Sequence, residues 1–309
     1  MKISIIGAGH VGGQAACVIA SAGLGDVVLL DVREGVAQGK ALDIGQSLAV
    51  ITGHTDIVGV EDWPETAGSD VLVITAGLAR RPGMDRHDLL TANGAIVLRV
   101  VREGLRWSPD ATVIIVTNPI NTMAYLAFKG SGLPSTRIIG MAGMLDNARF
   151  RYFIANEIAV PLVDISSWVI GDHGEHLVPV LSQTRVGDRL LMDCVTSEQL
   201  EWILARTRNA GTEILNYLHE GSAYFAPGAA IGRMISAIVG KEETPLPCSV
   251  HLRGEYGVED VMAGVPAILG RDGIREIIEF DLSMEERRQF TDAVDHIRHT
   301  NRQALHLIS

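Results

Sequence analysis

Lys2-Ile-Ser-Ile-Ile6-Gly7-Ala-Gly9-His-Val-Gly12 is the stretch of this sequence that decides its fold. Its apolar start predicts a β-strand over Lys2–Ile6, and the small residues from Val11 to about Ala22 predict a helix. The glycines between them follow the spacing G-x-G-x-x-G. Gly7 permits a tight turn, Gly9 lets a pyrophosphate approach the backbone, and Gly12 allows the helix to pack on the strand. Free N–H groups at the helix start then predict a phosphate-binding loop.

Asp31 follows the second predicted strand, over residues 27–30, and predicts which dinucleotide is bound. A carboxylate at this position would accept hydrogen bonds from both ribose hydroxyls of NAD and would repel the 2′-phosphate of NADP. NAD is therefore the expected cofactor. Arg33, a basic residue two positions later, is the feature that argues against this preference. The structural alternative for Asp31 is a helix N-cap.

The rest of the first half alternates strands and helices. Further strands are predicted over residues 55–59, 71–75, 112–116 and 138–140, with helices over about 33–50 and 88–105. This alternation predicts βαβ units and a doubly wound parallel sheet of the Rossmann type. We expect an NAD-binding domain over residues 1–143, followed without a flexible linker by the second domain.

The second half predicts a catalytic, substrate-binding domain of α+β class over residues 144–309. Helices are expected from residue 144, over about 196–219, up to 239 and over about 283–307. A strand is expected over 166–170, and strands over 247–252, 265–269 and on the approach to residue 280 predict an antiparallel sheet.

Charge and cysteine content exclude several classes of function. The 309 residues include 26 Lys and Arg against 37 Asp and Glu, a net charge of -11, which argues against nucleic acid or an anionic membrane as a partner. No apolar run approaches the ~20 residues of a membrane span.

Cys17, Cys194 and Cys248 form no C-x-x-C pair and predict free thiols without a metal site. The first strand leaves no room for a signal peptide, so we expect a cytoplasmic protein.

Three arginines follow the strand that ends at Thr75, in the stretch Thr75-Ala-Gly-Leu-Ala-Arg-Arg-Pro-Gly-Met-Asp-Arg86. Arg80, Arg81 and Arg86 form a cationic loop on an anionic protein, at the carboxyl end of a predicted strand. Guanidinium groups bind carboxylates with two parallel hydrogen bonds, so this loop predicts a site for a small carboxylate anion. The alternative is a turn whose arginines face water.

Val116-Thr117-Asn118-Pro119 ends the fifth predicted strand. Asn118 carries a donor and an acceptor into the crevice where open α/β sheets bind ligands, although a simple Asn-Pro turn explains the same residues. Pro119 is a candidate for a cis peptide bond. Asn93, in a predicted helix, is a candidate for the nicotinamide side. The full set of predicted cofactor-binding residues is Gly7, Ala8, Gly9, His10, Val11, Gly12, Asp31, Asn93, Val116, Thr117 and Asn118.

Candidates for acid–base chemistry lie in the second half. Asp146 and Arg149 are three residues apart on a predicted helix and so share a face, an arrangement that a surface salt bridge also explains. His173 lies between glycines, in Gly171-Asp-His-Gly174, and histidine is the side chain best suited to exchange a proton near neutral pH. A metal cluster of His173 and His176 with neighbouring carboxylates is the alternative, but the helical H-E-x-x-H spacing is absent.

Together these stretches resemble the lactate/malate dehydrogenase family, in its lactate-dehydrogenase-like branch, over almost the whole chain. The matching stretches are Gly7–Gly12, 76–86, 117–119, 145–149, 171–179 and 221–227. The resemblance implies NAD-dependent oxidation of (S)-malate to oxaloacetate and the reverse, a reaction of the tricarboxylic acid cycle. Lactate or another 2-hydroxy acid is the alternative substrate. A catalytically silent NAD-binding scaffold is the alternative of another class.

The resemblance also implies roles for individual residues. His173 would donate and accept the proton, and Asp146 would orient the imidazole of His173. Arg149 would hold the C1 carboxylate, together with Asn118, and Arg86 would polarise the reacting carbonyl. Arg80 falls where lactate enzymes carry glutamine, and would hold the distal carboxylate of malate.

The predicted helix over residues 33–50 also bears on assembly. It is apolar or small on more than one side, so it has more apolar surface than its own domain can cover. The family resemblance implies a homodimer through this helix, or a homotetramer in which two such dimers are paired.

Overall fold

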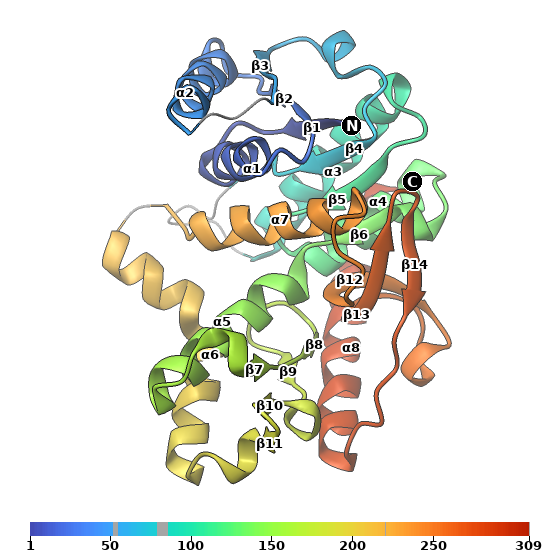
Figure 1. Ribbon diagram of the computed structural model, residues 1–309. Coiled ribbons are helices and arrows are strands. Elements are labelled where there is room, and N and C mark those ends of the chain that lie inside the picture. Colours follow the sequence, from blue (N-terminus) through green and yellow to red (C-terminus); the bar gives the residue numbers. More distant parts are fainter. Residues whose placement is uncertain (52–54, 79–85, 220, 309) are drawn as a thin grey trace.

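The computed structural model describes residues 1–51, 55–78, 86–219 and 221–308, with the side chain of Arg86 outside the description. In the first half, strands and helices alternate as predicted (Figure 1). The elements are β1 (Lys2–Ile6), α1 (His10–Ser21), β2 (Asp26–Leu30), α2 (Val36–Val50), β3 (Ile57–Val60), β4 (Val71–Ile74), α3 (Arg86–Trp107), β5 (Thr112–Ile115), α4 (Ile120–Ser131) and β6 (Ile138–Gly140).

The second half carries longer helices and antiparallel strands. Its helices are α5 (Ala142–Ile158), α6 (Ser197–Leu218), α7 (Phe225–Ile238) and α8 (Met284–Ala304). Its strands are β7 (Ile165–Ser166), β8 (Val169–Gly171), β9 (Leu177–Pro179), β10 (Arg185–Val186), β11 (Arg189–Leu190), β12 (Leu246–Arg253), β13 (Glu259–Gly270) and β14 (Gly273–Ile277).

Within the described residues, one continuous sheet crosses both halves, in the order β3-β2-β1-β4-β5-β6-β12-β13-β8-β9. The strands from β3 to β6 are parallel, as the doubly wound prediction requires. β12 then pairs with β6 in the antiparallel sense, with Ser249 opposite Gly140. The two halves therefore share a sheet, a connection that the sequence did not predict.

Both faces of the parallel sheet are buried. Val71 and Val73 of β4 pack into the core on one face, with residues of α1, α2 and α7, and Leu72 and Ile74 pack into the core on the other, with residues of α3 and α4. When successive side chains of a strand point into two different cores, all of them are apolar and the sequence shows a continuous apolar run. The sequence of β4 has this pattern, which predicts a strand buried on both faces. Figure 1 shows α7 beside α1, and the two helices are in contact.

Two of the differences from the predicted boundaries have a clear physical cause. The helix expected from residue 33 begins at Val36, because Gly35 takes a left-handed conformation at its N-cap (φ 71°) and Asp31 is engaged elsewhere. The strand expected over residues 166–170 is two strands. β7 pairs with β10 in a small second sheet, whereas β8 pairs with β13 and β9 in the large one, so the chain changes sheets at Ser167 and Trp168.

None of the helices in the described ranges is long and apolar enough to cross a membrane.

Candidate active site

The glycine loop joins β1 to α1 and has the backbone geometry that its sequence predicts. Gly7 has φ 112°, a conformation that favours glycine. A Cβ on Gly12 would lie 1.9 Å from the carbonyl oxygen of Gly7, so only glycine allows α1 to start this close to β1. A Cβ on Gly9 would meet nothing within 4 Å. The space next to Gly9 is therefore open, and Gly9 caps α1 without a side-chain hydrogen bond to the first N–H groups.

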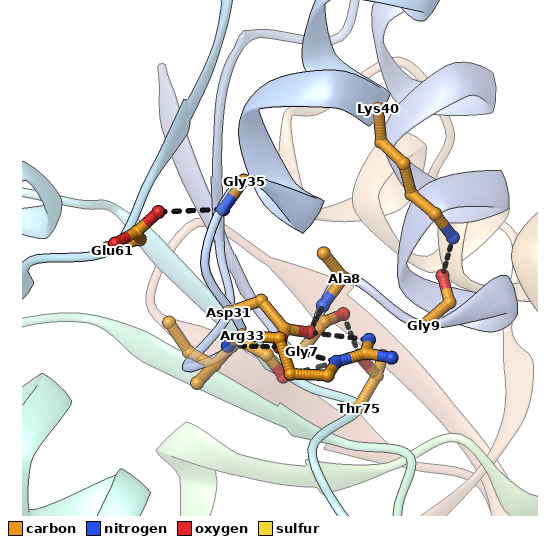
Figure 2. Close-up of polar contacts among 10 residues, drawn as sticks. Gly7, Ala8, Gly9, Asp31, Arg33, Gly35, Lys40, Glu61 and Thr75 are labelled. Carbon is orange, nitrogen blue, oxygen red and sulfur yellow. Dashed lines mark hydrogen bonds and ion pairs between the residues drawn. The ribbon is translucent and has the colours of Figure 1, made fainter.

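Asp31 lies directly beside this loop (Figure 2). Its Oδ2 accepts a hydrogen bond from the backbone N–H of Ala8 at 2.7 Å, and its Oδ1 accepts one from the backbone N–H of Arg33 at 3.0 Å. The N-cap alternative for Asp31 is wrong, since Gly35 caps α2. Burial raises the pKa of Asp31, but the hydrogen bonds from Arg33 and Ala8 outweigh burial and lower the pKa overall. The carboxylate is thus held charged at the end of β2.

These features fit a bound dinucleotide. The loop offers an open backbone surface at Gly9 and a helix N-terminus for phosphates, and the fixed Asp31 carboxylate lies next to both. His10, the first residue of α1, stacks on Tyr224 with ring centroids 5.2 Å apart. The start of α1 is therefore packed against the segment that leads into α7.

The ends of β4 and β5 lie beside the glycine loop and are joined by side chains. The Thr75 hydroxyl donates to the Gly7 carbonyl at 2.8 Å, and the Thr117 hydroxyl donates to the Ala76 carbonyl at 2.7 Å. Asn93 is 1% exposed, and among the described residues its side chain bonds to backbone: it accepts from the N–H of Leu78 and donates to the carbonyl of Asn118, each at 2.8 Å. Its amide therefore links the two strand ends. The Asn118–Pro119 peptide bond is cis.

The proton-exchange candidates are brought together. Nδ1 of His173 lies 2.8 Å from Oδ2 of Asp146, which is 1% exposed. Burial lowers the pKa of His173, but the negative charge and hydrogen bond of Asp146 raise it by more than burial lowers it. The pKa of His173 therefore lies above its ordinary value. Nε2 is the ring nitrogen left to exchange a proton with a ligand.

Arg149 completes this cluster. Its Nη1 lies 3.5 Å from Oδ1 of Asp146, and its side chain is 14% exposed, so the surface-pair alternative is wrong. Burial lowers the pKa of Arg149, while Asp146 counteracts that effect. Among the described residues, Nε of Arg149 and Oδ1 of Asp146 are buried without a hydrogen-bond partner. Buried polar groups without a partner call for an explanation, and a ligand held in this cavity would supply one.

A single cavity of about 670 Å³ brings the predicted residues together. Val116 and Asn118 come to it from the end of β5, Arg149 from α5 and His173 from the turn after β8, and Val11 of the glycine loop also lines it. The cavity lies at the carboxyl end of the parallel strands, where open α/β sheets bind ligands. Proton-exchanging, cationic and amide groups thus line one cavity.

Asp172 supports the turn that carries His173. Its Oδ1 accepts hydrogen bonds from Asn121 Nδ2 at 2.7 Å and from the backbone N–H of His173 at 2.8 Å, and its Oδ2 lies 2.9 Å from Nδ1 of His296. With Asp172 and His173 so engaged, the metal-cluster alternative has no support. In the part of the chain that the structure describes, no group of three or more metal-ligating side chains is arranged around a common point.

The arginine loop predicted over residues 75–86 falls largely outside the described residues. Arg80 and Arg81 lie outside the described residues, and for Arg86 the structure gives only its position as the first residue of α3.

Arg208 is a cavity-lining cation that the sequence did not single out. It belongs to α6, where the sequence predicts only an amphipathic helix, and it lines the same cavity as Arg149 and His173. Burial lowers its pKa. Glu175 also lines this cavity and offsets part of the positive charge. Helix periodicity places Arg208 one turn after Leu204, at the border of the apolar face of α6, but does not reveal what that side faces.

Comparison with known proteins identifies relatives along the whole chain. Residues 1–140 match the family model described as the lactate/malate dehydrogenase NAD binding domain, and residues 143–308 match the model of the lactate/malate dehydrogenase alpha/beta C-terminal domain. A malate dehydrogenase of Desulforudis audaxviator is 48% identical over 297 residues, with 96% of each chain covered.

Solved structures agree with this assignment. The malate dehydrogenase of Salinibacter ruber is 39% identical with a TM-score of 0.94, covering 99% of this chain and 98% of that one. The lactate dehydrogenase of Cryptosporidium parvum, complexed with lactic acid and β-nicotinamide adenine dinucleotide, is 38% identical with a TM-score of 0.93, covering 97% and 96%. Both substrate classes thus share this backbone, and side chains must separate them.

Proposed function

The chain belongs to the lactate/malate dehydrogenase family, and we propose that it catalyses the NAD-dependent oxidation of (S)-malate to oxaloacetate and the reverse reaction. The observation that carries this proposal is the buried pair of His173 and Asp146, which shares one cavity with Arg149 at the carboxyl ends of the parallel strands. A scaffold that only binds NAD has no need of such an arrangement.

In this proposal, His173 and Asp146 handle the proton. During malate oxidation, Nε2 of His173 accepts the proton of the C2 hydroxyl, and the imidazolium that forms is stabilised by Asp146. In the reverse direction, the protonated ring returns that proton to the carbonyl oxygen of oxaloacetate. The 2.8 Å contact at Nδ1 fixes the tautomer and the ring orientation. NAD, when bound, would supply the hydride acceptor.

Cations position the substrate. The fork of Arg149 suits the C1 carboxylate, because two parallel hydrogen bonds fix its orientation next to His173. Arg208 adds positive charge to the same cavity and favours a dianion over a monoanion. The arginine loop would supply Arg80 for the distal carboxylate and Arg86 for the carbonyl oxygen.

Other groups hold the cofactor. The residues proposed to surround it are Gly7 to Gly12, Asp31, Val116, Thr117 and Asn118. Asn93 is proposed as a positioning residue, because its side-chain amide is bonded to the backbone that follows β4 and to the backbone that follows β5.

A spectrophotometric assay tests the proposed function. Oxidation of NADH is followed with oxaloacetate and, separately, with pyruvate. We expect rapid oxidation with oxaloacetate and little with pyruvate. A preference for pyruvate would move the chain to the lactate enzymes, and no oxidation with either substrate would contradict the proposed function.

We also propose that the chain forms a homodimer or homotetramer through α2. Leu42 and Val50 of this helix are 65% and 83% exposed, and Val58 of the adjoining β3 is 48% exposed. This apolar surface remains although Ala41 and Ile44 are buried against the chain's own sheet. Size-exclusion chromatography with light scattering is expected to give at least twice the mass of 33.2 kDa, and a monomer would contradict this.

We place the protein in the cytoplasm. Cys17, Cys194 and Cys248 are free thiols, as expected for a reducing compartment. Burial raises the pKa of Cys248 to about 12, so this thiol is protected from reaction. Cell fractionation tests the compartment directly, and recovery of the activity outside the cytoplasmic fraction would contradict this placement.

A further inference from the structure

Arg33 covers the carboxylate that is expected to recognise the cofactor ribose. Its Nε donates to Oδ1 of Asp31 at 3.0 Å and its Nη2 donates to Oδ2 at 3.1 Å, a two-point contact of guanidinium with carboxylate. Figure 2 shows the two groups side by side next to the glycine loop. The Asp31 carboxylate, which is expected to discriminate between NAD and NADP, is therefore paired with the positive charge of Arg33.

This contact can open without disturbing the fold. The side chain of Arg33 is 62% exposed, whereas that of Asp31 is 7% exposed. The backbone N–H groups of Ala8 and Arg33 still hold the carboxylate in place if the guanidinium moves. Ribose hydroxyls would then replace Nε and Nη2 as donors to Asp31, and the guanidinium would stay within reach of the same end of the nucleotide.

A second cation lies close to this pair. Nζ of Lys40 donates to the Gly9 carbonyl at 2.8 Å (Figure 2). Burial lowers the pKa of Lys40, and the nearby positive charge of Arg33 lowers it further. Glu61 is hydrogen-bonded to the N–H of Gly35 and to Gln38 at the start of α2. Asp31 therefore has two cations near it, Arg33 and Lys40, while the other carboxylate, Glu61, is bonded to Gly35 and Gln38. This arrangement is unfavourable for rejecting a phosphate.

We propose that Arg33 is a cofactor-specificity residue that allows this chain to bind NADP as well as NAD. It neutralises Asp31 and offers its guanidinium to the 2′-phosphate, the group that an arginine near this position accommodates in dinucleotide-binding folds. This inference rests on the proposed function, because it assigns the adenosine end of the cofactor to Asp31.

Calorimetric titration of the intact protein with NAD and with NADP tests the proposal without turnover. Arg33→Gln keeps most of the side-chain length and removes the charge. We expect it to raise the Kd of NADP by about tenfold or more, as for loss of a charged hydrogen-bond partner, and to change the Kd of NAD by less than about threefold. The matched control is Arg106→Gln, which removes an exposed arginine paired with Glu103 on α3. It should leave both affinities unchanged.

Three results would overturn the proposal. The first is a wild-type protein that binds NAD but no NADP at millimolar concentration. The second is an Arg33→Gln variant with an unchanged ratio of the two affinities. The third is an Arg33→Gln variant that binds NAD more tightly than wild type but binds NADP equally well. In that case Arg33 would only compete with the ribose for Asp31.

A parallel assay separates this inference from the proposed function. NADH and NADPH oxidation by oxaloacetate are compared in wild type and Arg33→Gln. Failure with both cofactors contradicts the proposed function. Activity with NADH, together with the same NADPH-to-NADH ratio in both proteins, contradicts only the role of Arg33.

Discussion

The imidazole of His173 meets the carboxylate of Asp146 across 27 residues of sequence, with Nδ1 2.8 Å from Oδ2. Asp146 comes from α5, and His173 from the turn after β8. The same carboxylate lies beside Arg149, so one buried carboxylate contacts both side chains. In the proposed function, the proton-exchanging group and the substrate-binding group therefore share Asp146.

Asp146→Asn tests the orienting role. The amide has nearly the same shape but lacks the negative charge, so it neither stabilises the imidazolium nor favours the required tautomer. We expect kcat for oxaloacetate reduction to fall by about 10³- to 10⁴-fold, as for loss of the carboxylate in a comparable catalytic pair. NADH affinity, measured by calorimetry, should stay within about threefold. Retention of most of kcat would remove Asp146 from the mechanism.

The raised pKa of His173 predicts opposite pH dependences for the two directions. Reduction of oxaloacetate needs the protonated ring, so its kcat/KM should fall as pH rises through that pKa. Malate oxidation needs the neutral ring and should rise over the same range. In Asp146→Asn, both transitions should move to lower pH, because the charge that raises the pKa is gone. Profiles that do not move would mean that another group titrates.

The same shift predicts a stability effect. A pKa raised by folding stabilises the folded state below the unfolded pKa of histidine, and this contribution is lost as pH rises through the folded value. Denaturant unfolding of wild type and Asp146→Asn across this range should show a difference that shrinks with rising pH.

Arg149→Lys tests the carboxylate contact. Lysine keeps the charge but lacks the planar fork, so we expect kcat/KM for oxaloacetate to fall about 10- to 100-fold. Arg151→Lys is the matched control: it lies on the same helix, and its Nη2 donates to the carbonyl of Leu162, away from the cavity. Equal losses in both variants would indicate a general effect on α5.

Arg80→Gln tests the substrate preference. We expect kcat/KM for oxaloacetate to fall by about two orders of magnitude or more, while that for pyruvate is spared, because an unpaired cation no longer opposes the smaller substrate in a closed pocket. Arg81→Gln is the neighbouring control and should have the weaker effect. If the oxaloacetate preference survives in Arg80→Gln, Arg208 becomes the next candidate for the distal carboxylate.

Two glycines of the same loop should separate folding from cofactor binding. Gly12→Ala places a Cβ 1.9 Å from the Gly7 carbonyl oxygen, so we expect the free energy of unfolding to fall by at least ~1–3 kcal/mol. Gly9→Ala meets no protein atom within 4 Å and should change stability by less than ~1 kcal/mol. It should weaken NAD binding, since its Cβ occupies the space left for the pyrophosphate. Unchanged NAD affinity in Gly9→Ala would argue against this loop as the phosphate site.

The sequence by itself determined the local elements of this protein. β1, β4 and the turn at Gly7 depend on residues within a few positions of one another, and apolar runs and glycines report such contacts directly. The types of residue needed for the chemistry, His173 between glycines and Asp146 three before Arg149, were also legible, because each has a function that few other side chains perform.

Only the tertiary structure decided which of these residues meet. Four features depend on how distant or differently oriented segments pack. They are the pairing of β12 with β6, the burial of Asp146 and Arg149, the position of Arg208 at the cavity, and the contact of Arg33 with Asp31. Neither periodicity nor spacing encodes such contacts, since the free energy that fixes them comes from the assembled core. For this reason the pair of Asp146 and Arg149, for which a surface salt bridge was the alternative, is largely buried, and the carboxylate expected to bind a ribose is paired with an arginine.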